Sequence, residues 1–304
     1  MKASFNIERI ATQCVCCGSE KLRNSPAVLM PFVAHRAFGW KPIEIDDSWG
    51  LITIKNGNAY SICNSLFCDN CTLLFLDIRF NEKEILKLYT DYRGIEYTKL
   101  REIYEPGYSE RNKTLNLKID YTEAIENFLE PYVETPLTIL DWGGDTGQNT
   151  PFNKNNIDFD IYDISDKKVM PGAKKINKND ASKKKYGLIV CRGVLEHVPF
   201  PMQLLYDIKI SMNNNSILYI QVPLEDLVYK NEKDYYLRKK HWHEHINFFS
   251  EESLKQLTRN VGLEILDLKK IKIKNNGSIQ PSYEFLVACK KKNYKEYNLK
   301  INKI

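Results

Sequence analysis

The sequence has no long hydrophobic run and no leader-like start. No apolar stretch approaches the roughly 20 residues that a membrane-spanning helix needs, and the mean hydropathy is -0.44. The opening residues, MKASFNIERIATQ, carry charges where a signal peptide has its apolar core. A composition of 43% hydrophobic and 27% charged residues does not indicate disorder. We therefore expect a folded cytoplasmic protein with no membrane span.

An excess of one charge is also lacking. Lys and Arg total 44 and Asp and Glu total 39, which leaves a net charge of only +5. Much of this excess lies in a basic tail over residues 291–304. Such a tail can contact nucleic acid or a membrane surface, but a solvated lysine-rich tail is the preferred explanation. Nucleic acid is therefore not the expected partner, and nothing here predicts the oligomeric state.

Cysteines are scarce after residue 71, because six of the eight lie within the first 71 residues. Two Cys-x-x-Cys pairs stand about 50 residues apart, and two such knuckles can place four thiolates around one structural zinc ion. Scattered buried cysteines are the alternative, and the pattern does not separate zinc from iron. The predicted ligands are Cys14, Cys17, Cys68 and Cys71, with Cys16 and Cys63 as spare thiols that could replace one of them.

Periodicity and composition divide the chain into four parts. Residues 1–80 form the cysteine-bearing module, and residues 81–135 have apolar positions at helical spacing, as in a helical lid or linker. Within them, residues 114–133 predict one long amphipathic helix. Residues 136–290 alternate short apolar runs with helical segments, and the basic tail, residues 291–304, follows.

The alternation over residues 136–290 predicts an α/β fold. Strands followed by helices imply a mainly parallel sheet with helices on both faces. Ligands in such sheets bind at the carboxyl ends of the strands. The expected strands are 137–141, 159–162, 187–191 and 217–222, with a closing pair at 264–273 and 283–289; helices are expected at 200–212 and 251–261.

A glycine-rich turn follows the first of these strands. The strand ends at Asp141, and glycines at 143, 144 and 147 let the backbone turn sharply and approach a ligand. Asp163 ends the next strand, where a carboxylate can bind both hydroxyls of a ribose. Asp180 lies one segment further and is the candidate acceptor for an adenine amino group. A nicotinamide cofactor fits this pattern too.

The run Asp141-Trp-Gly143-Gly144-Asp145-Thr-Gly147 resembles the first motif of class I S-adenosylmethionine-dependent methyltransferases, Asp-x-Gly-x-Gly-x-Gly. It departs from the motif at Asp145, beside Gly144. The resemblance implies a Rossmann-like methyltransferase sheet that binds S-adenosylmethionine.

A second segment, Tyr186 to Pro199, is similar to the fourth strand of that family and the Leu-Glu-His-Val-Pro that follows it. In the family this segment lines the methionine side of the cofactor, which implies contacts from Cys191, Arg192 and Gly193. His197 within it is interpreted as a residue that positions the loop.

Three of the five histidines gather at His241-Trp242-His243-Glu244-His245, beyond a strand and before a helix that Ser250 can cap. Loops beyond sheet strands commonly carry active sites. The cluster could bind a metal ion, supply a general base, or form a structural hydrogen-bond network.

The zinc module, the class I motif and His-Glu-His before Phe-Phe-Ser together resemble the sugar C-methyltransferase group, without its further C-terminal domain. In that group the segment reads Tyr-His-Glu-His. Trp242 stands at the tyrosine position, while His243, Glu244 and His245 match. The resemblance implies methyl transfer to a nucleotide-linked sugar or another surface-polysaccharide precursor, with His245, held by Glu244, as general base.

Two other functions fit parts of the sequence. In an RNA methyltransferase, the zinc module and the basic tail would bind the nucleic acid. A non-enzymatic protein could retain the fold and bind the cofactor without turnover. A small-molecule acceptor is preferred because the positive charge is slight and is not gathered around the cysteines.

Overall fold

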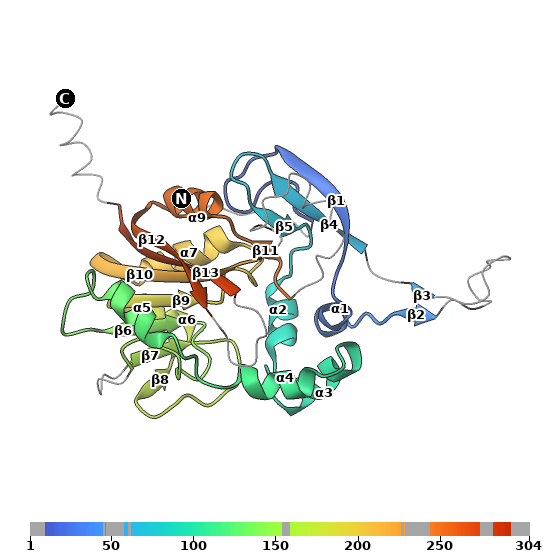
Figure 1. The fold of residues 1–304 in the computed structure, drawn as a ribbon, viewed down its shortest axis with the longest axis horizontal. Helices are drawn as coiled ribbons and strands as arrows, with labels where there is room; N and C mark the ends of the chain where they lie inside the picture. The colour runs from blue at the N-terminus through green and yellow to red at the C-terminus, as the bar shows by residue number, and fades with distance from the viewer. Residues whose placement is uncertain are drawn as a thin grey trace.

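A seven-stranded sheet dominates the C-terminal half of the chain and confirms the predicted α/β fold (Figure 1). The computed structural model describes residues 10–44, 46, 58–59, 62–153, 159–225, 228, 244–273 and 282–292. The strand order is β12-β13-β10-β9-β6-β7-β8. The strands are β6 (Ile139–Trp142), β7 (Phe159–Tyr162), β8 (Ala173–Lys175), β9 (Tyr186–Arg192), β10 (Met212–Leu224), β12 (Leu263–Ile273) and β13 (Ser282–Lys291).

The sheet is parallel from β8 to β10 and ends in an antiparallel pair. β6 lies parallel between β7 and β9, and β8 and β10 extend the sheet on either side. β13 is antiparallel to both β10 and β12. The order of connection reverses between β6 and β9, so the loops after these strands diverge. Such a switch point opens a binding crevice at the carboxyl ends of the strands.

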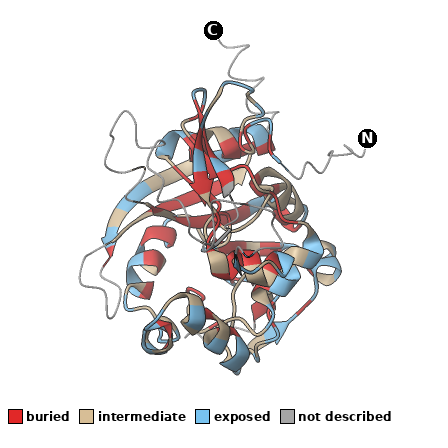
Figure 2. Cartoon of the chain, turned by 90° about the vertical axis from the view of Figure 1, so that its right-hand side faces the viewer, coloured by how far each residue is buried: buried red, intermediate tan, exposed pale blue. Residues whose placement is uncertain are grey.

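Helices cover both faces of the sheet. On β9, Leu188 and Val190 belong to the apolar cluster of α5 (Thr122–Leu129), while Ile189 and Cys191 belong to that of α7 (Pro201–Ile210) and α9 (Glu251–Val261). Alternate side chains of a strand point to opposite faces, which is why residues 188–191 of this strand are all apolar. Figure 2 shows the buried residues gathered along the sheet and on the inner sides of these helices. The short helix α6 (Lys178–Lys183) precedes β9.

The prediction of one long helix over residues 114–133 is wrong. Before it come α2 (Glu82–Tyr89) and α3 (Ile95–Tyr104), and α4 (Tyr108–Leu115) includes its first two residues. The next helix, α5, begins only at Thr122. Between α4 and α5, backbone groups form hydrogen bonds with side chains of the glycine-rich loop. In a helix they would bond to other backbone groups. Ile119 N–H donates to Asn149 Oδ1 at 3.0 Å, and Gln148 Nε2 donates to the carbonyl of residue 116 at 3.2 Å. The apolar spacing over residues 114–133 predicted the buried face of a helix, but Leu117, at one of these apolar positions, is 55% exposed.

The cysteine-bearing region has a second sheet, completed by a strand from the other half of the chain. Its order is β1-β4-β5-β11, and β11 pairs with β5 although about 170 residues separate them. The two predicted parts, 1–80 and 136–290, therefore share a hydrogen-bonded sheet. The elements are β1 (Leu22–Val28), β4 (Ile62–Cys68), β5 (Leu74–Leu76) and β11 (Asn247–Phe248), with α1 (Pro31–Phe38) and the pair β2 (Ile43–Glu44) and β3 (Asn58–Ala59) beside them.

The start of α9 joins the two halves. Ser250 caps the helix as predicted, in a capping box with Ser253. The Ser250 hydroxyl also lies 2.6 Å from the Thr72 hydroxyl, directly after the second Cys-x-x-Cys pair. The cap thus anchors α9 and also contacts the cysteine knuckle.

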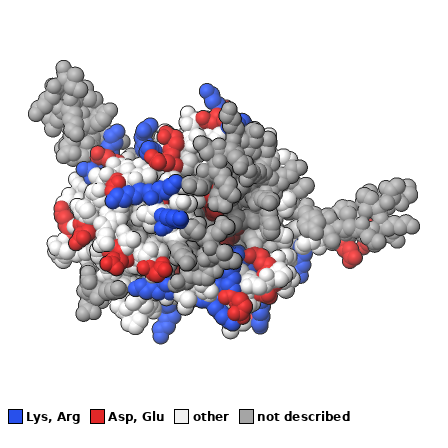
Figure 3. Space-filling model, viewed as in Figure 1, with Lys and Arg blue, Asp and Glu red and all other residues white. Residues whose placement is uncertain are grey.

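The described surface has mixed charge on the face shown in Figure 3, where Lys and Arg are interspersed with Asp and Glu. Among the described residues, no helix is long and apolar enough to cross a membrane. Among the described residues of this face, Lys and Arg do not gather into the broad basic stripe that marks nucleic-acid binding.

Candidate active site and cysteine cluster

The loop after β6 has space only for glycine at two positions. Gly143 has φ +82°, and a Cβ there would lie 2.4 Å from Cγ2 of Val194. A Cβ on Gly144 would lie 2.6 Å from the carboxyl carbon of Asp141. The backbone of this loop therefore passes so close to neighbouring side chains that a residue with a Cβ would clash at both positions.

Asp145, the departure from the methyltransferase motif, takes up the conformation expected of a glycine. Its φ is +52°, in the left-handed region that Asp tolerates better than most residues. Its N–H donates to Asp163 Oδ2 at 2.9 Å, and its carboxylate pairs with Lys167 at 2.9 Å. Asp163 Oδ1 accepts from Ser165 N–H at 2.7 Å. Asp163 is thus held at the end of β7 with further lone pairs on its oxygens.

A cavity of about 350 Å³ opens at the carboxyl ends of β6, β9 and β10. The segments from Tyr92 to Arg93 and from Thr114 to Tyr121 line its other side. A smaller hollow of about 130 Å³ adjoins it, sharing Gly143 and Asp145, and Asp163 lines this hollow. The crevice expected from the strand order is therefore present.

The predicted cofactor-binding residues are only partly assembled around this cavity. Asp180 does not line it; the Asp180 side chain pairs with Lys183 at the exposed start of α6. Cys191 is fully buried in the sheet core. A Cβ on Gly147 would lie 2.6 Å from the side chain of Ile161, so this glycine allows the loop to pack on β7. The cavity is lined by Asp141, Gly143, Gly144, Asp145, Arg192 and Gly193.

Asp141 is a buried acid at the floor of the cavity. Its Oδ2 accepts from the Thr150 hydroxyl at 2.5 Å. Burial raises the pKa of Asp141 to about 6. A polar ligand or cation reaching this carboxylate would favour its ionised form.

His245 faces the cavity with its ring orientation set by an acid. Its Nδ1 lies 2.6 Å from Oε1 of Glu225, the residue directly after β10. With the proton on Nδ1, the lone pair of His245 is on Nε2. Burial lowers the pKa of His245 to about 4, so the ring is neutral at pH 7. A neutral imidazole backed by a carboxylate can accept a proton.

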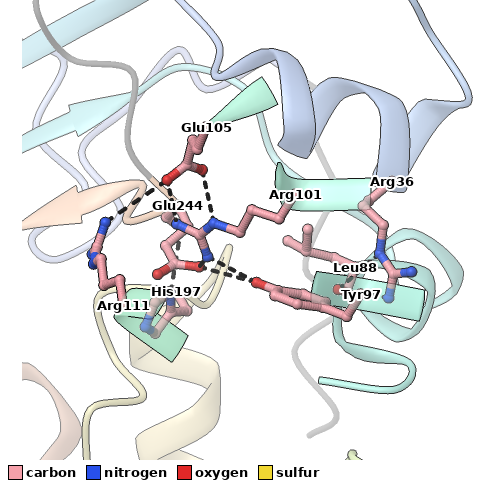
Figure 4. A network of polar contacts seen from close by, with 8 residues as sticks. All are labelled: Arg36, Leu88, Tyr97, Arg101, Glu105, Arg111, His197 and Glu244. Carbon is pink, nitrogen blue, oxygen red and sulfur yellow. Dashed lines mark hydrogen bonds and ion pairs between the residues drawn. The ribbon is translucent and has the colours of Figure 1, made fainter. Parts of the chain in front are cut away.

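The acid bonded to His245 is therefore Glu225 rather than the expected Glu244. The Glu244 carboxylate extends toward the helical region, where Arg101 Nη1 donates to it at 2.8 Å and the Tyr97 hydroxyl lies at 3.4 Å (Figure 4). Arg101 is 3% exposed and also pairs with Glu105 at 2.7 Å. A buried arginine between two carboxylates ties the segment before β11 to α3. His243, the third predicted catalytic residue, lies outside the described residues.

Glu196 and His197 join His245 in the cavity wall. The His197 and His245 rings meet edge to face with centroids 4.5 Å apart, and His197 Nδ1 lies 3.3 Å from the carbonyl oxygen of Glu244. Glu196 is 3% exposed, and burial raises the pKa of its carboxyl well above the usual range. One ligand atom from each of the three lies within 4.8 Å of the others, which also satisfies the spacing of a metal site. His197 thus lies beside His245 in the cavity wall, and its role as a residue that positions the loop stays a prediction.

Sequence reasoning missed three acids and one amide of this cavity. Glu225 stands three residues after the end of the predicted strand 217–222, and an acid just beyond a strand is the signal that could have revealed it. Glu284 lies on the predicted closing strand, opposite Pro223 of β10, and an acid on a buried strand is a similar signal. Burial raises the pKa of Glu284 to about 7. The missed residues are Glu196, Gln221 and Glu284, which line the cavity, and Glu225, which lies behind it in contact with His245.

The four predicted cysteines form one cluster. Their sulfurs all lie within 4.8 Å of one another, with Cys14 and Cys71, and Cys17 and Cys68, each 3.5 Å apart. The two knuckles have the same backbone turn. Gly18 N–H bonds to the carbonyl of Cys14, and Thr72 N–H bonds to the carbonyl of Cys68, both at 2.8 Å and both donors at positive φ. Four thiols converging from two such turns suit a tetrahedral zinc ion.

The protein has a Rossmann-like sheet with a crevice at the carboxyl ends of its strands, and comparison with known proteins gives its class. The family model described as a methyltransferase domain matches residues 116–268. The chain therefore belongs to the methyltransferase family and is an S-adenosylmethionine-dependent methyltransferase. No curated protein sequence matches the chain.

Solved methyltransferase structures resemble it at low sequence identity. A methyltransferase from Anabaena variabilis is 14% identical over 60% of this chain and 91% of that one, with a TM-score of 0.42. The 1,6-didemethyltoxoflavin-N1-methyltransferase of Burkholderia thailandensis is 14% identical over 64% and 87%, with a TM-score of 0.45. Magnesium protoporphyrin IX methyltransferase from Synechocystis is 14% identical over 66% and 96%, with a TM-score of 0.45. The family assignment rests on the match over residues 116–268.

Proposed function

We propose that this enzyme transfers a methyl group to a small polar acceptor, with a nucleotide-linked sugar or another surface-polysaccharide precursor as the preferred class. The observation that carries the proposal is that one cavity contains both the glycine-rich loop and His245. Arg93, Tyr121 and Gln221 add hydrogen-bonding groups to its walls. The polar groups that line this cavity suit a polar acceptor.

The loop of Gly143 to Asp145 and the carboxylate of Asp163 would hold S-adenosylmethionine, because the close backbone and an acid at the end of β7 suit a ribose. The bound cofactor supplies an electrophilic methyl group on its sulfonium. The contribution of the protein is to orient the acceptor and exclude water, which brings the two reactants into line.

His245 is the proposed proton acceptor. As the acceptor's oxygen or carbon gains the methyl group, it loses a proton to Nε2 of His245, and the proton later passes to water. Glu225, bonded to Nδ1, stabilises the imidazolium that forms. Glu244 would act at a distance from the base, through Arg101 and the position of the chain before β11.

The direct test combines binding with transfer. Calorimetric titration with S-adenosylhomocysteine should give a dissociation constant of about 1 μM or tighter, near -8 kcal/mol. Nucleoside-diphosphate sugars should then accept label from methyl-labelled S-adenosylmethionine. Label found in RNA at low salt, and in none of the sugars, would reject the sugar proposal in favour of a nucleic-acid acceptor.

We further propose one structural zinc ion at the cysteine cluster. Metal analysis of the purified protein should find one zinc per chain. Because structural zinc supplies on the order of 10 kcal/mol in small zinc domains, Cys68→Ser should lose the metal and lower the melting temperature by at least about 5 °C. Cys63→Ser, which removes a buried thiol outside the cluster, is the matched control and should retain the zinc. A wild-type protein without metal, at the same melting temperature as Cys68→Ser, would contradict the assignment.

A further inference from the structure

A buried arginine of the N-terminal region contacts both segments that carry the imidazoles of the cavity. Arg79 is 1% exposed. Its Nη1 donates to the carbonyl oxygen of Pro199 at 2.9 Å and to Oδ1 of Asn247 at 3.1 Å. Pro199 ends the loop that carries His197, and Asn247 comes two residues after His245. One guanidinium nitrogen therefore bridges the two segments.

The bonding of Arg79 is directed at main-chain and amide oxygens. Within the described part of the chain, no carboxylate forms an ion pair with it. Its Nη2 donates to the carbonyl of Leu76 on β5, and its guanidinium carbon lies 5.5 Å from the centre of the Phe75 ring. Burial lowers the pKa of Arg79 to about 9, so it is still a cation at neutral pH. An apolar side chain could fill this space without the free-energy cost of removing a charge from water. What Arg79 provides, and an apolar residue could not, is its set of directed hydrogen bonds.

Asn247 is the junction through which Arg79 reaches the loop of residues 195–199. Its Nδ2 donates to the carbonyls of Leu195 at 2.8 Å and Val198 at 2.7 Å. Its backbone N–H donates to the carbonyl of Glu196 at 3.1 Å. Asn247 itself is 1% exposed and belongs to β11, which pairs with β5. The relative position of the two imidazole-bearing segments thus depends on Asn247, and the Asn247 amide oxygen accepts from Arg79.

We propose that Arg79 is a positioning residue for methyl transfer. Through Asn247 it aligns β11 with the loop of residues 195–199, and this alignment directs His245 toward the acceptor. On this proposal, the sheet of the N-terminal region supports the active site of the same chain, in addition to carrying a zinc ion. The inference rests on the proposed role of His245, but the alignment can be measured without any acceptor.

The test compares Arg79→Met and Arg79→Lys with the matched control Arg23→Met. Arg23 lies on β1 of the same sheet and pairs with Asp69 near the surface. Each protein is labelled with [15N]histidine for imidazole spectra, with His245 assigned by its own substitution. Hydrogen exchange is followed over residues 244–248 and over residues 139–147, and S-adenosylhomocysteine affinity is measured by calorimetry.

In Arg79→Met, we expect His245 to lose its single Nδ1–H signature and the amides of residues 246 and 247 to exchange at least about tenfold faster. Exchange over residues 139–147 and S-adenosylhomocysteine affinity should stay within about threefold of wild type. Arg79→Lys should recover part of the signature, because an ammonium group has three donors but no planar fork. Arg23→Met should match wild type in every readout.

A folded Arg79→Met protein with a wild-type imidazole spectrum and wild-type exchange would overturn the proposal. If that variant does not fold, Asn247→Ser replaces it, and an unchanged His245 spectrum there is equally decisive against it. Failure of wild-type protein to bind S-adenosylhomocysteine would instead reject the proposed cofactor function, while the imidazole spectra would still test the positioning role.

Discussion

Replacing Asp163 with alanine should weaken S-adenosylhomocysteine binding by at least about 100-fold. A carboxylate that accepts from both ribose hydroxyls makes two charge-assisted hydrogen bonds, each contributing about 1.5–3 kcal/mol. Asp163 also accepts from the N–H groups of Asp145 and Ser165 at 2.9 and 2.7 Å, so its loss releases the glycine-rich loop as well. Calorimetric titration measures the change directly, and circular dichroism checks that the fold is intact.

Asp180→Ala is the informative companion to this variant. The sequence placed Asp180 at the adenine, but in the structure the Asp180 side chain pairs with Lys183 on the exposed start of α6 and does not line the cavity. Affinity within about twofold of wild type is expected. An equal loss in both variants would restore Asp180 to the cofactor site, and unchanged affinity in Asp163→Ala would remove Asp163 from it.

Replacing His245 with alanine should lower kcat by about 10²- to 10⁴-fold, the usual contribution of a positioned general base. S-adenosylhomocysteine affinity should be retained, because the glycine-rich loop and Asp163 are separate from this ring. Glu225→Gln should lower kcat by a smaller factor, because the His245 imidazole is still present. Only the orientation of the ring and the stabilisation of its charged form are weakened. Single-turnover kinetics with the acceptor would separate chemistry from product release. Wild-type turnover in His245→Ala would return the histidine to a structural role.

The pH profile gives a second check on His245. Burial lowers its pKa to about 4. Below that pH the ring is protonated and cannot accept a proton, and above it the ring is neutral. We therefore expect no fall in kcat from this group between about pH 6 and 8, with the loss confined to more acidic solution. A His245 imidazole that titrates near pH 6.5 in the [15N]histidine spectra would show that it behaves as an ordinary exposed histidine.

Much of the fold could be predicted because it is encoded locally. The apolar runs of the sheet strands are short and bounded by turns, and six of the seven strands fall where the sequence places them. The exception is β8, Ala173–Lys175, whose residues are mostly polar and carry no strand signal. The helix expected over residues 114–133 failed for the opposite reason. Its apolar spacing was present, but the chain there bonds to Gln148 and Asn149 of the glycine-rich loop.

The candidate site was predictable in its parts but not in its pairings. The glycines, Asp163 and His245 each stand at the end of a predicted strand or in the loop beyond it, which is a local signal. The partner of His245 was assigned to its chain neighbour Glu244, whereas the structure places Glu225 at 2.6 Å. Adjacent side chains on an extended segment point in opposite directions. Proximity in sequence therefore misassigned the acid.

By itself the sequence determined the class of fold, the glycine-rich turn and the two cysteine pairs, because periodicity and residue spacing act over a few residues. Only the tertiary structure decided that β11 completes the N-terminal sheet, that Arg79 reaches Asn247, and that Glu225 meets His245. The residues that meet in these contacts are separated by 20 to about 170 positions in the sequence. They depend on strand register and on which buried polar groups find partners, and both are set by the packing of the whole chain.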